Sequence, residues 1–246
     1  MKQRVEQMKK WIRQQVPEGS KAIIGISGGK DSTIAAALCV EALGAENVIG
    51  VCMPQYRQDD IRDAYRVCEL LNIHRFEINI GSICEELCYK IDVEYDYDKK
   101  SINNPMIKTN LPARIRMATL YAVAALYPNS RVVNTCNYSE DYVGYSTKYG
   151  DAAGDFSPLG NLTVREVLAV GDFLGLPHYL VHKTPNDGMC GKSDEEKLGF
   201  TYEQLDDYIL HTRHVDIDIV EKIEKLHRAT RHKYMPIPTF CDWEEE

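Results

Sequence analysis

The sequence predicts an α/β fold, in which a doubly wound parallel sheet is flanked by helices. Three observations support this prediction. Short apolar runs recur along the chain, segments with helical spacing separate them, and a glycine-rich loop follows the first apolar run. Apolar runs that alternate with helices pair as parallel strands, because each connecting helix returns the chain in the same direction. We expect a single domain over residues 1–246, with a helical C-terminal extension.

The first helix is expected over residues 1–13, because Val5, Met8, Trp11 and Ile12 fall on one side of it. Strands are expected at residues 21–26, 47–53, 75–80 and 130–135. The carboxyl ends of parallel strands share one edge of the sheet, and ligands of open α/β sheets bind at that edge. The glycine-rich loop after the first strand lies there.

The second half of the chain is expected to contain more helices and two flexible loops. The first loop covers about residues 93–108, where the sequence becomes polar and loses its periodicity, and the second covers about 184–194 and is a candidate lid. Further helices are expected at 195–198, 202–211 and 217–230. A long helix is expected over 110–127, with an apolar face formed by Met117, Leu120, Tyr121, Ala124 and Ala125.

Net charge, the length of apolar runs and cysteine spacing argue against several classes of protein. The formal net charge is −8, so the chain has no overall electrostatic footprint for a polyanion such as tRNA. It contains no apolar run of eighteen residues and no apolar leader, so we expect a cytoplasmic protein that does not bind membranes. Its eight cysteines form no C-x-x-C motif, which favours buried free thiols over disulfides or a metal site.

The segment Ser27-Gly28-Gly29-Lys30-Asp31-Ser32 is the strongest functional signal in the chain. It stands between an apolar strand and a helix start, where unpaired backbone N–H groups and the helix dipole favour phosphate. The spacing fits neither the Walker A pattern nor the dinucleotide G-x-G-x-x-G pattern. An ordinary βα turn with a serine cap is the alternative.

This segment resembles the S-G-G-x-D-S signature of the PP-loop ATP pyrophosphatases, which have a Rossmann-like fold and split ATP between its α and β phosphates. Residues 110–117, 134–140 and 144–151, with matches onward to about residue 238, resemble the ammonia-dependent NAD synthetases in order and spacing. The resemblance implies that ATP adenylates the nicotinate carboxylate of deamido-NAD. Ammonia then displaces AMP, so that NAD, AMP and pyrophosphate are released.

The resemblance also implies roles for particular residues. Mg²⁺ is the expected cofactor, with Asp31 and Glu140 as its ligands. Asp151 is expected to hold ammonium or accept its proton, and Lys183 to act in catalysis on the ATP phosphates. The expected ATP-binding residues are Ser27, Gly28, Gly29, Lys30, Asp31, Ser32, Thr135 and Lys183. The expected deamido-NAD-binding residues are Asn110, Arg114, Lys148, Asp155, His232 and Lys233.

Several of these residues also have plain structural alternatives. Asp31 could complement a helix dipole, Arg114 could form a helix-face salt bridge, and Asp155 could shape an Asx turn. Asp151 could order the turn that precedes it, and Glu140 and Lys183 could be ordinary surface residues. The resemblance is also incomplete: Cys52 stands where longer bacterial enzymes have an arginine near adenine, and the segment before Tyr202 is shorter than theirs. It therefore does not assign the lid residues, which include Ser193.

We expect the enzyme to use free ammonia, because the chain has no room for a nitrilase-type glutaminase domain. A separate glutaminase partner stays open. The family is typically homodimeric, which suits the alanine-rich helix after Asn110. Two alternatives remain: a PP-loop enzyme that modifies tRNA, which predicts a basic groove, and a non-catalytic nucleotide sensor, which predicts loss of Asp31, Glu140 or Lys183.

Overall fold

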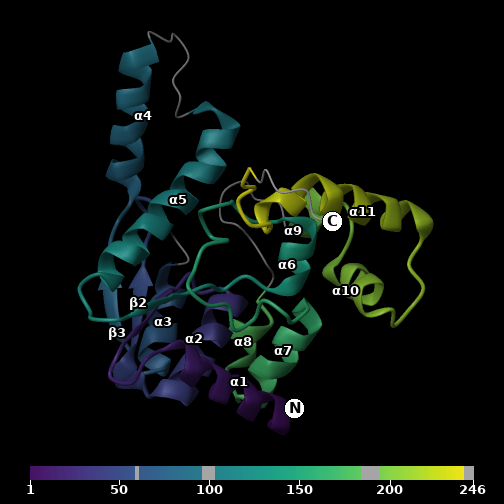
Figure 1. Cartoon of the computed structure of the whole chain (residues 1–246), viewed down its shortest axis with the longest axis horizontal. Helices are drawn as coiled ribbons and strands as arrows, with labels where there is room; N and C mark the ends of the chain where they lie inside the picture. The colour runs from purple at the N-terminus through teal and green to yellow at the C-terminus, as the bar shows by residue number, and fades with distance from the viewer. Residues whose placement is uncertain (59–60, 96–102, 184–193, 241–246) are drawn as a thin grey trace.

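The computed structural model describes residues 1–58, 61–95, 103–183 and 194–240. Within these residues a parallel sheet has the strand order β3-β2-β1-β4, and helices cover both of its faces (Figure 1). Its strands are β1 (Ala22–Gly25), β2 (Val48–Cys52), β3 (His74–Glu77) and β4 (Arg131–Val133). They lie in the four predicted segments, except that β3 begins one residue early, and the parallel α/β fold is confirmed.

The helices that follow the strands in sequence also surround them in space. Those in the first half are α1 (Lys2–Gln15), α2 (Lys30–Leu43), α3 (Ile61–Leu70), α4 (Gly81–Tyr95) and α5 (Pro105–Ala124). Those in the second half are α6 (Tyr138–Val143), α7 (Val164–Phe173), α8 (His178–Val181), α9 (Asp194–Leu198), α10 (Tyr202–Leu210) and α11 (Ile217–Thr230).

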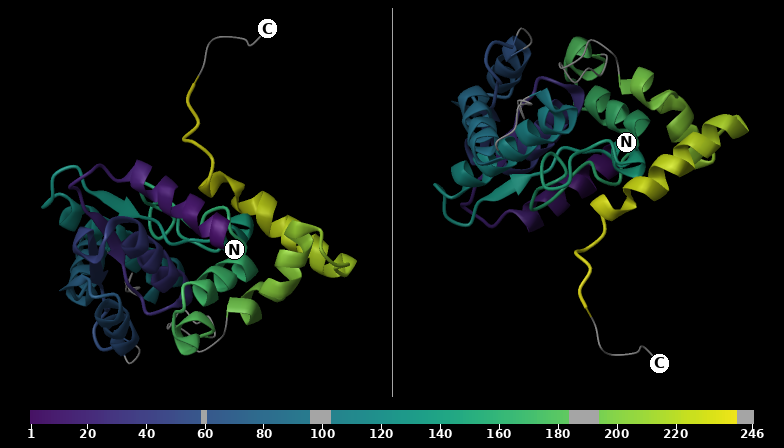
Figure 2. Two further views of the ribbon diagram at one scale, coloured as in Figure 1. Left: turned by 90° about the horizontal axis from the view of Figure 1, so that it is seen from below. Right: turned by 90° about the horizontal axis from the view of Figure 1, so that it is seen from above.

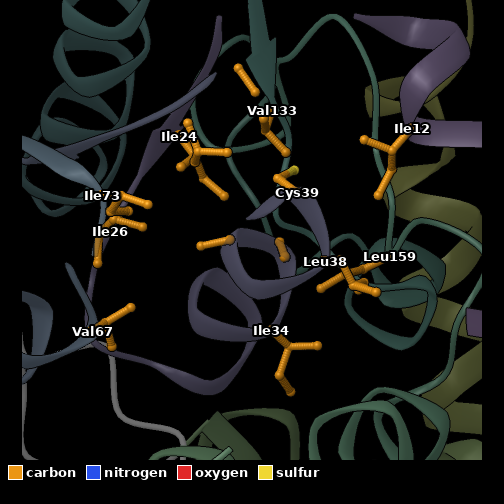
Figure 3. Close-up of a cluster of buried hydrophobic side chains, with 14 of the residues drawn as sticks. Ile12, Ile24, Ile26, Ile34, Leu38, Cys39, Val67, Ile73, Val133 and Leu159 are labelled. Atoms are coloured by element: carbon orange, nitrogen blue, oxygen red, sulfur yellow. The ribbon is translucent and has the colours of Figure 1, made fainter. Parts of the chain in front are cut away.

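The central strands β1 and β2 are buried on both faces, as their apolar runs require, whereas the edge strand β3 is mostly exposed. Ile24 of β1 packs on one face against Ile34 and Leu38 of α2, in a cluster that also includes residues of α1, α3, α7 and α8 (Figure 3). Ile23, its neighbour in sequence, points to the other face and joins a cluster with Val123 of α5. This alternation fixes the register of β1 between two helical layers.

The C-terminal helices form a third cluster, away from the sheet. Leu205 of α10 and Ile223 of α11 are fully buried there against Val143 of α6 and Val164 of α7. The predicted helical extension is therefore confirmed, and it packs on α6 rather than on a strand. After the short 3₁₀ turn that follows α11, the chain leaves the body of the molecule (Figure 2), and Phe240 is almost fully exposed.

The predicted loop over residues 93–108 is wrong at both ends. Helix α4 continues to Tyr95, and α5 begins at Pro105. The start of α5 is set by Asn104, whose side chain accepts hydrogen bonds from the backbone N–H groups of Met106 and Ile107 at 2.9 and 3.4 Å. Proline suits the position after such a cap, because it has no N–H to leave unpaired. Residues 96–102 lie outside the described residues.

The predicted apolar face of the helix over 110–127 is also partly wrong. Val123 and Ala124 are buried, whereas Tyr121 and Ala125 are exposed. The N-terminal turns of α5 pack on α4 and its C-terminal turns pack on β1 and β4, so no single stripe is buried along its length. Helical periodicity alone could not show that the helix changes partners.

The apolar face of α1 and the free cysteines largely agree with the sequence-based predictions. In α1, Val5 and Ile12 are buried as predicted, but Trp11 is exposed and meets Phe156 edge-on, with 6.0 Å between ring centroids. Six cysteines within the described residues are free and buried, which confirms the prediction for them. Within the described ranges, no helix combines the length and apolar character needed to cross a membrane. Nearly all of the candidate lid, residues 184–193, lies outside the described residues.

Candidate functional site

The glycine-rich loop links the carboxyl end of β1 to the first turn of α2. The Ser27 and Ser32 hydroxyls lie 3.0 Å apart, and the backbone N–H of Gly29 donates to Ser27 Oγ at 3.2 Å. Gly28 has φ of +78°, and a Cβ there would lie 2.7 Å from the backbone nitrogen of Ala64 in α3. Only glycine fits both the conformation and the space. The loop is therefore held in one shape, with its hydroxyls gathered at a helix N-terminus.

The two predicted metal ligands lie together, although 109 positions separate Asp31 and Glu140 in the sequence. Asn137 positions both. Its side-chain Nδ2 donates to Asp31 Oδ1 at 3.0 Å, and its Oδ1 accepts from the backbone N–H of Glu140 at 3.0 Å as the cap of α6. The turn after β4 thus brings a carboxylate to the carboxylate in the first turn of α2.

A buried cation lies between these carboxylates. Lys30 Nζ is 2.5 Å from Asp31 Oδ2 and 3.8 Å from Glu140 Oε1, and the lysine side chain is 5% exposed. Burial alone would lower the pKa of Lys30, but the negative charges of Asp31 and Glu140 outweigh burial and raise it. Burial raises the pKa of Glu140, and the charge of Asp31 raises it further.

The donor set suits a hard divalent cation. Two carboxylates face one point, and Mg²⁺ takes one or two carboxylates and completes its shell with phosphate oxygens and water. No group of three or more His, Cys, Asp or Glu side chains within the described residues could hold a metal by itself. Close by, the Tyr202 hydroxyl is buried without a hydrogen-bond partner among the described residues. Asp31 and Glu140 therefore fit Mg²⁺ that arrives with a nucleotide.

Lys183 lies near the loop and, like Gly28, contacts the first turn of α3. Its Nζ donates to Asp63 Oδ2 at 2.7 Å, and the Cβ of Asp63 borders the space beside Gly28. The hydrogen bond from Lys183 lowers the pKa of Asp63. Lys183 and Lys30 both line a pocket of about 390 Å³. Its lining residues are Lys30, Val164, Arg165, Leu168, Val181, His182, Lys183, Glu195, Tyr202, Glu203 and Asp206.

Most residues predicted for the dinucleotide converge on one turn, residues 144–151. Thr147 Oγ1 donates to Asn110 Oδ1 at 2.9 Å, and Arg114 Nε donates to the carbonyl oxygen of Lys148 at 3.4 Å. The Lys148 ammonium in turn donates to the carbonyl oxygen of His232 at 2.8 Å. Three segments that are far apart in the sequence, from α5, this turn and the end of α11, are thus in direct contact.

Lys233 closes the same group from the C-terminal side. Its Nζ donates to the carbonyl oxygens of Gly144 and Ser146, both at 2.7 Å. Burial lowers the pKa of Lys233, and the charge of Asp151 opposes this shift. Gly144 has φ of +67°, and a Cβ there would lie 2.1 Å from the Cβ of Thr230, so the close approach of α11 to this turn requires glycine.

Asp151 orders the turn at residues 144–151, as predicted by the structural alternative for this residue. Its Oδ1 accepts the backbone N–H of Thr147 at 2.8 Å, and its carbonyl oxygen accepts from Asn134 Nδ2 at 2.9 Å and from Cys136 Sγ at 3.3 Å. The residue is exposed, yet the surrounding chain desolvates its carboxyl group and raises its pKa. The segment between Asn134 and Asn137 therefore connects Asp151 with the Asp31 and Glu140 pair.

Asp155 and Thr135 are less closely joined to the site. Both carboxylate oxygens of Asp155 are engaged, because Oδ2 accepts the backbone N–H of Val132 at 2.7 Å and Oδ1 accepts the Tyr121 hydroxyl at 3.2 Å. Asp155 thus holds the end of β4 to the following segment. Thr135 is half-buried directly after β4. The structure does not place Asp155 with the residues around the 144–151 turn.

Two residues near the site, Asp194 and Arg116, are assigned no role from the sequence. Asp194 accepts a hydrogen bond from the Tyr145 hydroxyl at 2.8 Å, and its charge acts on Lys30. Arg116 of α5 donates to the carbonyl oxygen of Met53 at 3.1 Å, just beyond β2. Arg116 lies within the segment 110–117 that resembles the NAD synthetases, and Asp194 lies among the later matches, so the resemblance could have pointed to both.

Comparison with known proteins gives a consistent result. The family model described as NAD synthase matches residues 4–236. The NH(3)-dependent NAD(+) synthetase of Thermococcus kodakarensis is 39% identical over 225 residues, which cover 86% of this chain and 85% of that protein. The solved structure of an NMN synthetase from Francisella tularensis is 32% identical, covers 97% of each chain and has a TM-score of 0.86.

A second solved structure is the NH3-dependent NAD synthetase from Campylobacter jejuni. It is 28% identical, covers 98% of each chain and has a TM-score of 0.76. The match to the family model covers nearly the whole chain, and it includes the glycine-rich loop, the Asp31 and Glu140 pair and the turn at residues 144–151. This chain therefore belongs to the NAD synthase family.

Proposed function

We propose that this protein is an ammonia-dependent NAD synthetase, a ligase that forms a C–N bond. The carboxylate of deamido-NAD attacks the α-phosphorus of ATP, which forms an acyl adenylate and releases pyrophosphate. Ammonia then attacks the acyl carbon, AMP leaves with the former carboxylate oxygen, and one proton is released. Adenylation is required because a carboxylate has no leaving group that ammonia can displace.

One observation carries the proposal. The glycine-rich loop at the start of α2 faces a half-buried pair of carboxylates, Asp31 and Glu140, which are held in place by Asn137. Phosphate at a helix N-terminus beside two carboxylates is an arrangement for a nucleotide that carries a divalent cation. An arrangement that only capped a helix would not bury a lysine and two carboxylates together.

The residues of the loop and the carboxylate pair have separate tasks in this proposal. Mg²⁺ held by Asp31 and Glu140 would offset the negative charge that develops as pyrophosphate leaves. Ser27, Ser32 and the backbone of Gly29 would donate hydrogen bonds to phosphate oxygens. Thr135, directly after β4, would contribute to the same nucleotide site.

Lys183 would follow the ATP phosphates as pyrophosphate separates. Its ammonium is held by Asp63 beside the loop and lines the pocket that also contains Lys30. Three rotatable donors on a flexible stem suit a target whose oxygens move during the reaction. Lys183 would exchange Asp63 for phosphate when ATP binds.

The group around the 144–151 turn would bind deamido-NAD. Asn110, Arg114, Lys148, His232 and Lys233 supply cationic and amide groups that suit the phosphates and polar edges of a dinucleotide. Asp155 is a weaker member, because both its carboxylate oxygens already have protein donors.

Asp151 would attract ammonium and accept a proton as ammonia attacks. Its carbonyl oxygen is bonded to the segment that carries Asn137, so the turn is tied to the carboxylate pair. Hydrogen bonds from the backbone N–H groups of Thr147 and Asp151 and from the Thr147 side chain hold the carboxyl group in one orientation. A carboxylate in a desolvated setting attracts a small cation more strongly than one in water.

The proposal is tested by incubating the purified protein with ATP, Mg²⁺ and deamido-NAD, with ammonium chloride, with glutamine, or with neither. We expect NAD, AMP and pyrophosphate with ammonium chloride, and no amidation with glutamine alone. Equal rates with glutamine would overturn the use of free ammonia. ADP with phosphate would contradict the reaction itself, and ATP binding without turnover would identify a nucleotide sensor. Amidation only after a glutaminase is added to the glutamine sample would indicate a separate partner.

One comparison favours a second candidate substrate, the mononucleotide form of the same acid. The Francisella tularensis NMN synthetase has a TM-score of 0.86 with this chain, against 0.76 for the Campylobacter jejuni NAD synthetase. Measurement of kcat/KM for deamido-NAD and for nicotinic acid mononucleotide separates the two candidates. A preference for the dinucleotide supports the first, and a preference for the mononucleotide supports the second.

We also propose that the protein is a homodimer formed through α4. Ile83, Leu87 and Ile91 recur every four residues and are 44%, 40% and 41% exposed, so they form one apolar row on the helix. Helices α4 and α5 project side by side, on the side of the molecule away from α10 and α11 (Figure 1). An exposed apolar row of this kind is typical of a protein interface.

A further inference from the structure

The buried lysine of the glycine-rich loop has an unusual setting. Lys30 is the first residue of α2, where the helix dipole disfavours a positive charge, and it is almost fully buried. Its Nζ nevertheless lies 2.5 Å from Asp31 Oδ2 and 3.8 Å from Glu140 Oε1, and 5.8 Å from the ring centroid of Tyr202. The ammonium therefore occupies the point toward which the two proposed magnesium ligands are directed.

Charge balance explains why an ammonium can remain there. A buried ammonium without partners costs several kcal/mol, and so does each buried carboxylate. Asp31, Glu140 and the nearby Asp194 together supply the negative charge that Lys30 needs, and Lys30 prevents the carboxylates from repelling one another. Each charge is stable only while the others are present.

Resting on the proposed function, we propose that Lys30 is a built-in placeholder cation, which holds the Asp31 and Glu140 carboxylates together in the empty enzyme and must leave them when Mg²⁺ binds. Mg²⁺ and the ammonium compete for the same carboxylates, because a divalent cation and an ammonium held side by side by Asp31 and Glu140 would repel each other. The released ammonium stays at the helix N-terminus, where ATP brings negative phosphates. Binding of Mg²⁺ with ATP thus exchanges one set of ion pairs for another.

This competition has a measurable consequence. Removal of the ammonium leaves two buried carboxylates without a cation, so Mg²⁺ alone should bind more tightly and should stabilise the protein more. We expect Lys30→Met to tighten the Kd for Mg²⁺, measured without nucleotide, by about tenfold, which corresponds to about 1.4 kcal/mol. Methionine has a similar length and no oxygen that could itself bind the ion.

The experiment is a titration with MgCl₂ at constant ionic strength, followed by thermal unfolding. The wild-type protein should show a small rise in Tm and Lys30→Met a larger one, from a lower starting value. Lys30→Arg keeps the charge and should behave as wild type. Lys9→Met is a matched control. Lys9 also lies between two carboxylates, those of Glu6 and Glu41, and Glu41 is at the opposite end of α2 from Lys30.

A second measurement uses the wild-type protein and does not depend on the folding of any variant. Acetylation of lysines by a small reagent, followed by mass spectrometry, should modify Lys30 faster when Mg²⁺ is present, while the rate at Lys9 stays the same. Equal Mg²⁺ affinity in Lys30→Met and wild type, or unchanged acetylation of Lys30, would overturn the placeholder role. Neither measurement uses turnover, so a failure of NAD formation would overturn only the proposed function.

Discussion

At the scale of single residues, the site depends on side chains that perform two tasks. Asn137 caps α6 and holds Asp31, and Asp151 holds its own turn and is the carboxylate proposed to receive ammonium. Local hydrogen bonds fix the position of such residues, and contacts with residues in distant segments fix the orientation of their side chains. Their structural and functional roles can therefore be separated only by substitutions that preserve one and remove the other.

Asp151→Asn is such a substitution. The amide oxygen of asparagine can still accept the backbone N–H of Thr147, but the side chain no longer carries a charge or accepts a proton from ammonium. We expect kcat with ammonia to fall by about 100-fold, while the Kd for ATP changes by less than about threefold. Steady-state kinetics and ATP titration measure the two quantities. Equal losses in both would show that Asp151 only orders the turn.

The raised pKa of Asp141 leads us to expect that the stability of the fold depends on pH. Burial raises the pKa of Asp141 from 3.8 to about 6, and one of its carboxylate oxygens has no hydrogen-bond partner within the described part of the chain. Between these two values the folded protein binds a proton that the unfolded chain has lost, so the free energy of unfolding should decrease as pH rises through this window. The total decrease from this group is at most about 3 kcal/mol.

Urea unfolding of wild type and Asp141→Asn at pH 4 and pH 7.5 tests this dependence. The variant should be the more stable protein at pH 7.5, because its amide has no charge to desolvate. Asp207→Asn is the control with the opposite sign, since hydrogen bonds from Thr212 and Arg165 lower the pKa of Asp207 and its loss should destabilise the protein at pH 7.5. A variant less stable than wild type at pH 7.5 would contradict the assignment for Asp141.

At the scale of elements, short connections after strands position the chemistry. The loop between β1 and α2 leads into the first turn of α2, which carries Asp31, and the connection between β4 and α6 supplies Asn137 and leads into the first turn of α6, which carries Glu140. Both start at the carboxyl edge of the sheet, because right-handed crossovers bring all four strand ends there. A change in either connection should therefore affect binding more than it affects the fold.

A pair of cap substitutions tests this expectation. Asn137→Ala removes the cap of α6 together with the hydrogen bond to Asp31, whereas Thr201→Ala removes the corresponding cap of α10, whose side-chain hydrogen bonds are made with Gln204 and not with Asp31 or Glu140. Each should cost about 1 kcal/mol in the free energy of unfolding. Only Asn137→Ala should also weaken the binding of Mg²⁺ and ATP. Similar binding losses in both variants would show that α6 stability, not the Asp31 contact, sets affinity.

Strands β1, β2 and β4 could be predicted from the sequence because they are largely buried and appear as short apolar runs. The edge strand β3 is mostly exposed, and its predicted segment, residues 75–80, alternates polar and apolar residues instead. The start of α5 was missed, because a polar composition was given more weight than the Asn104-Pro105 cap signal. The pairing of Lys30 with Glu140 could not be predicted, since it depends on contacts between segments that are more than 100 residues apart. The motif identified the residues of the loop, and the fold supplied their partners.

At the scale of the whole molecule, the proposed dimer depends on one face of α4. Leu87→Glu places a charge in the middle of the apolar row and should convert the dimer to a monomer, while the isolated chain stays folded because this side chain is 40% exposed. Ile217→Glu is the matched control, since Ile217 is 68% exposed at the start of α11. Sedimentation analysis measures the mass of each. A dimeric Leu87→Glu protein would place the interface elsewhere.

The whole account depends on the transfer of AMP to an oxygen of the substrate carboxylate. Deamido-NAD with ¹⁸O in both carboxylate oxygens follows that transfer directly, because the oxygen that attacks the α-phosphorus leaves with AMP. After one turnover with ammonia in unlabelled water, mass spectrometry should find one ¹⁸O in AMP and one in the amide of NAD. Unlabelled AMP, or ¹⁸O in pyrophosphate or phosphate, would contradict adenylation of the acid.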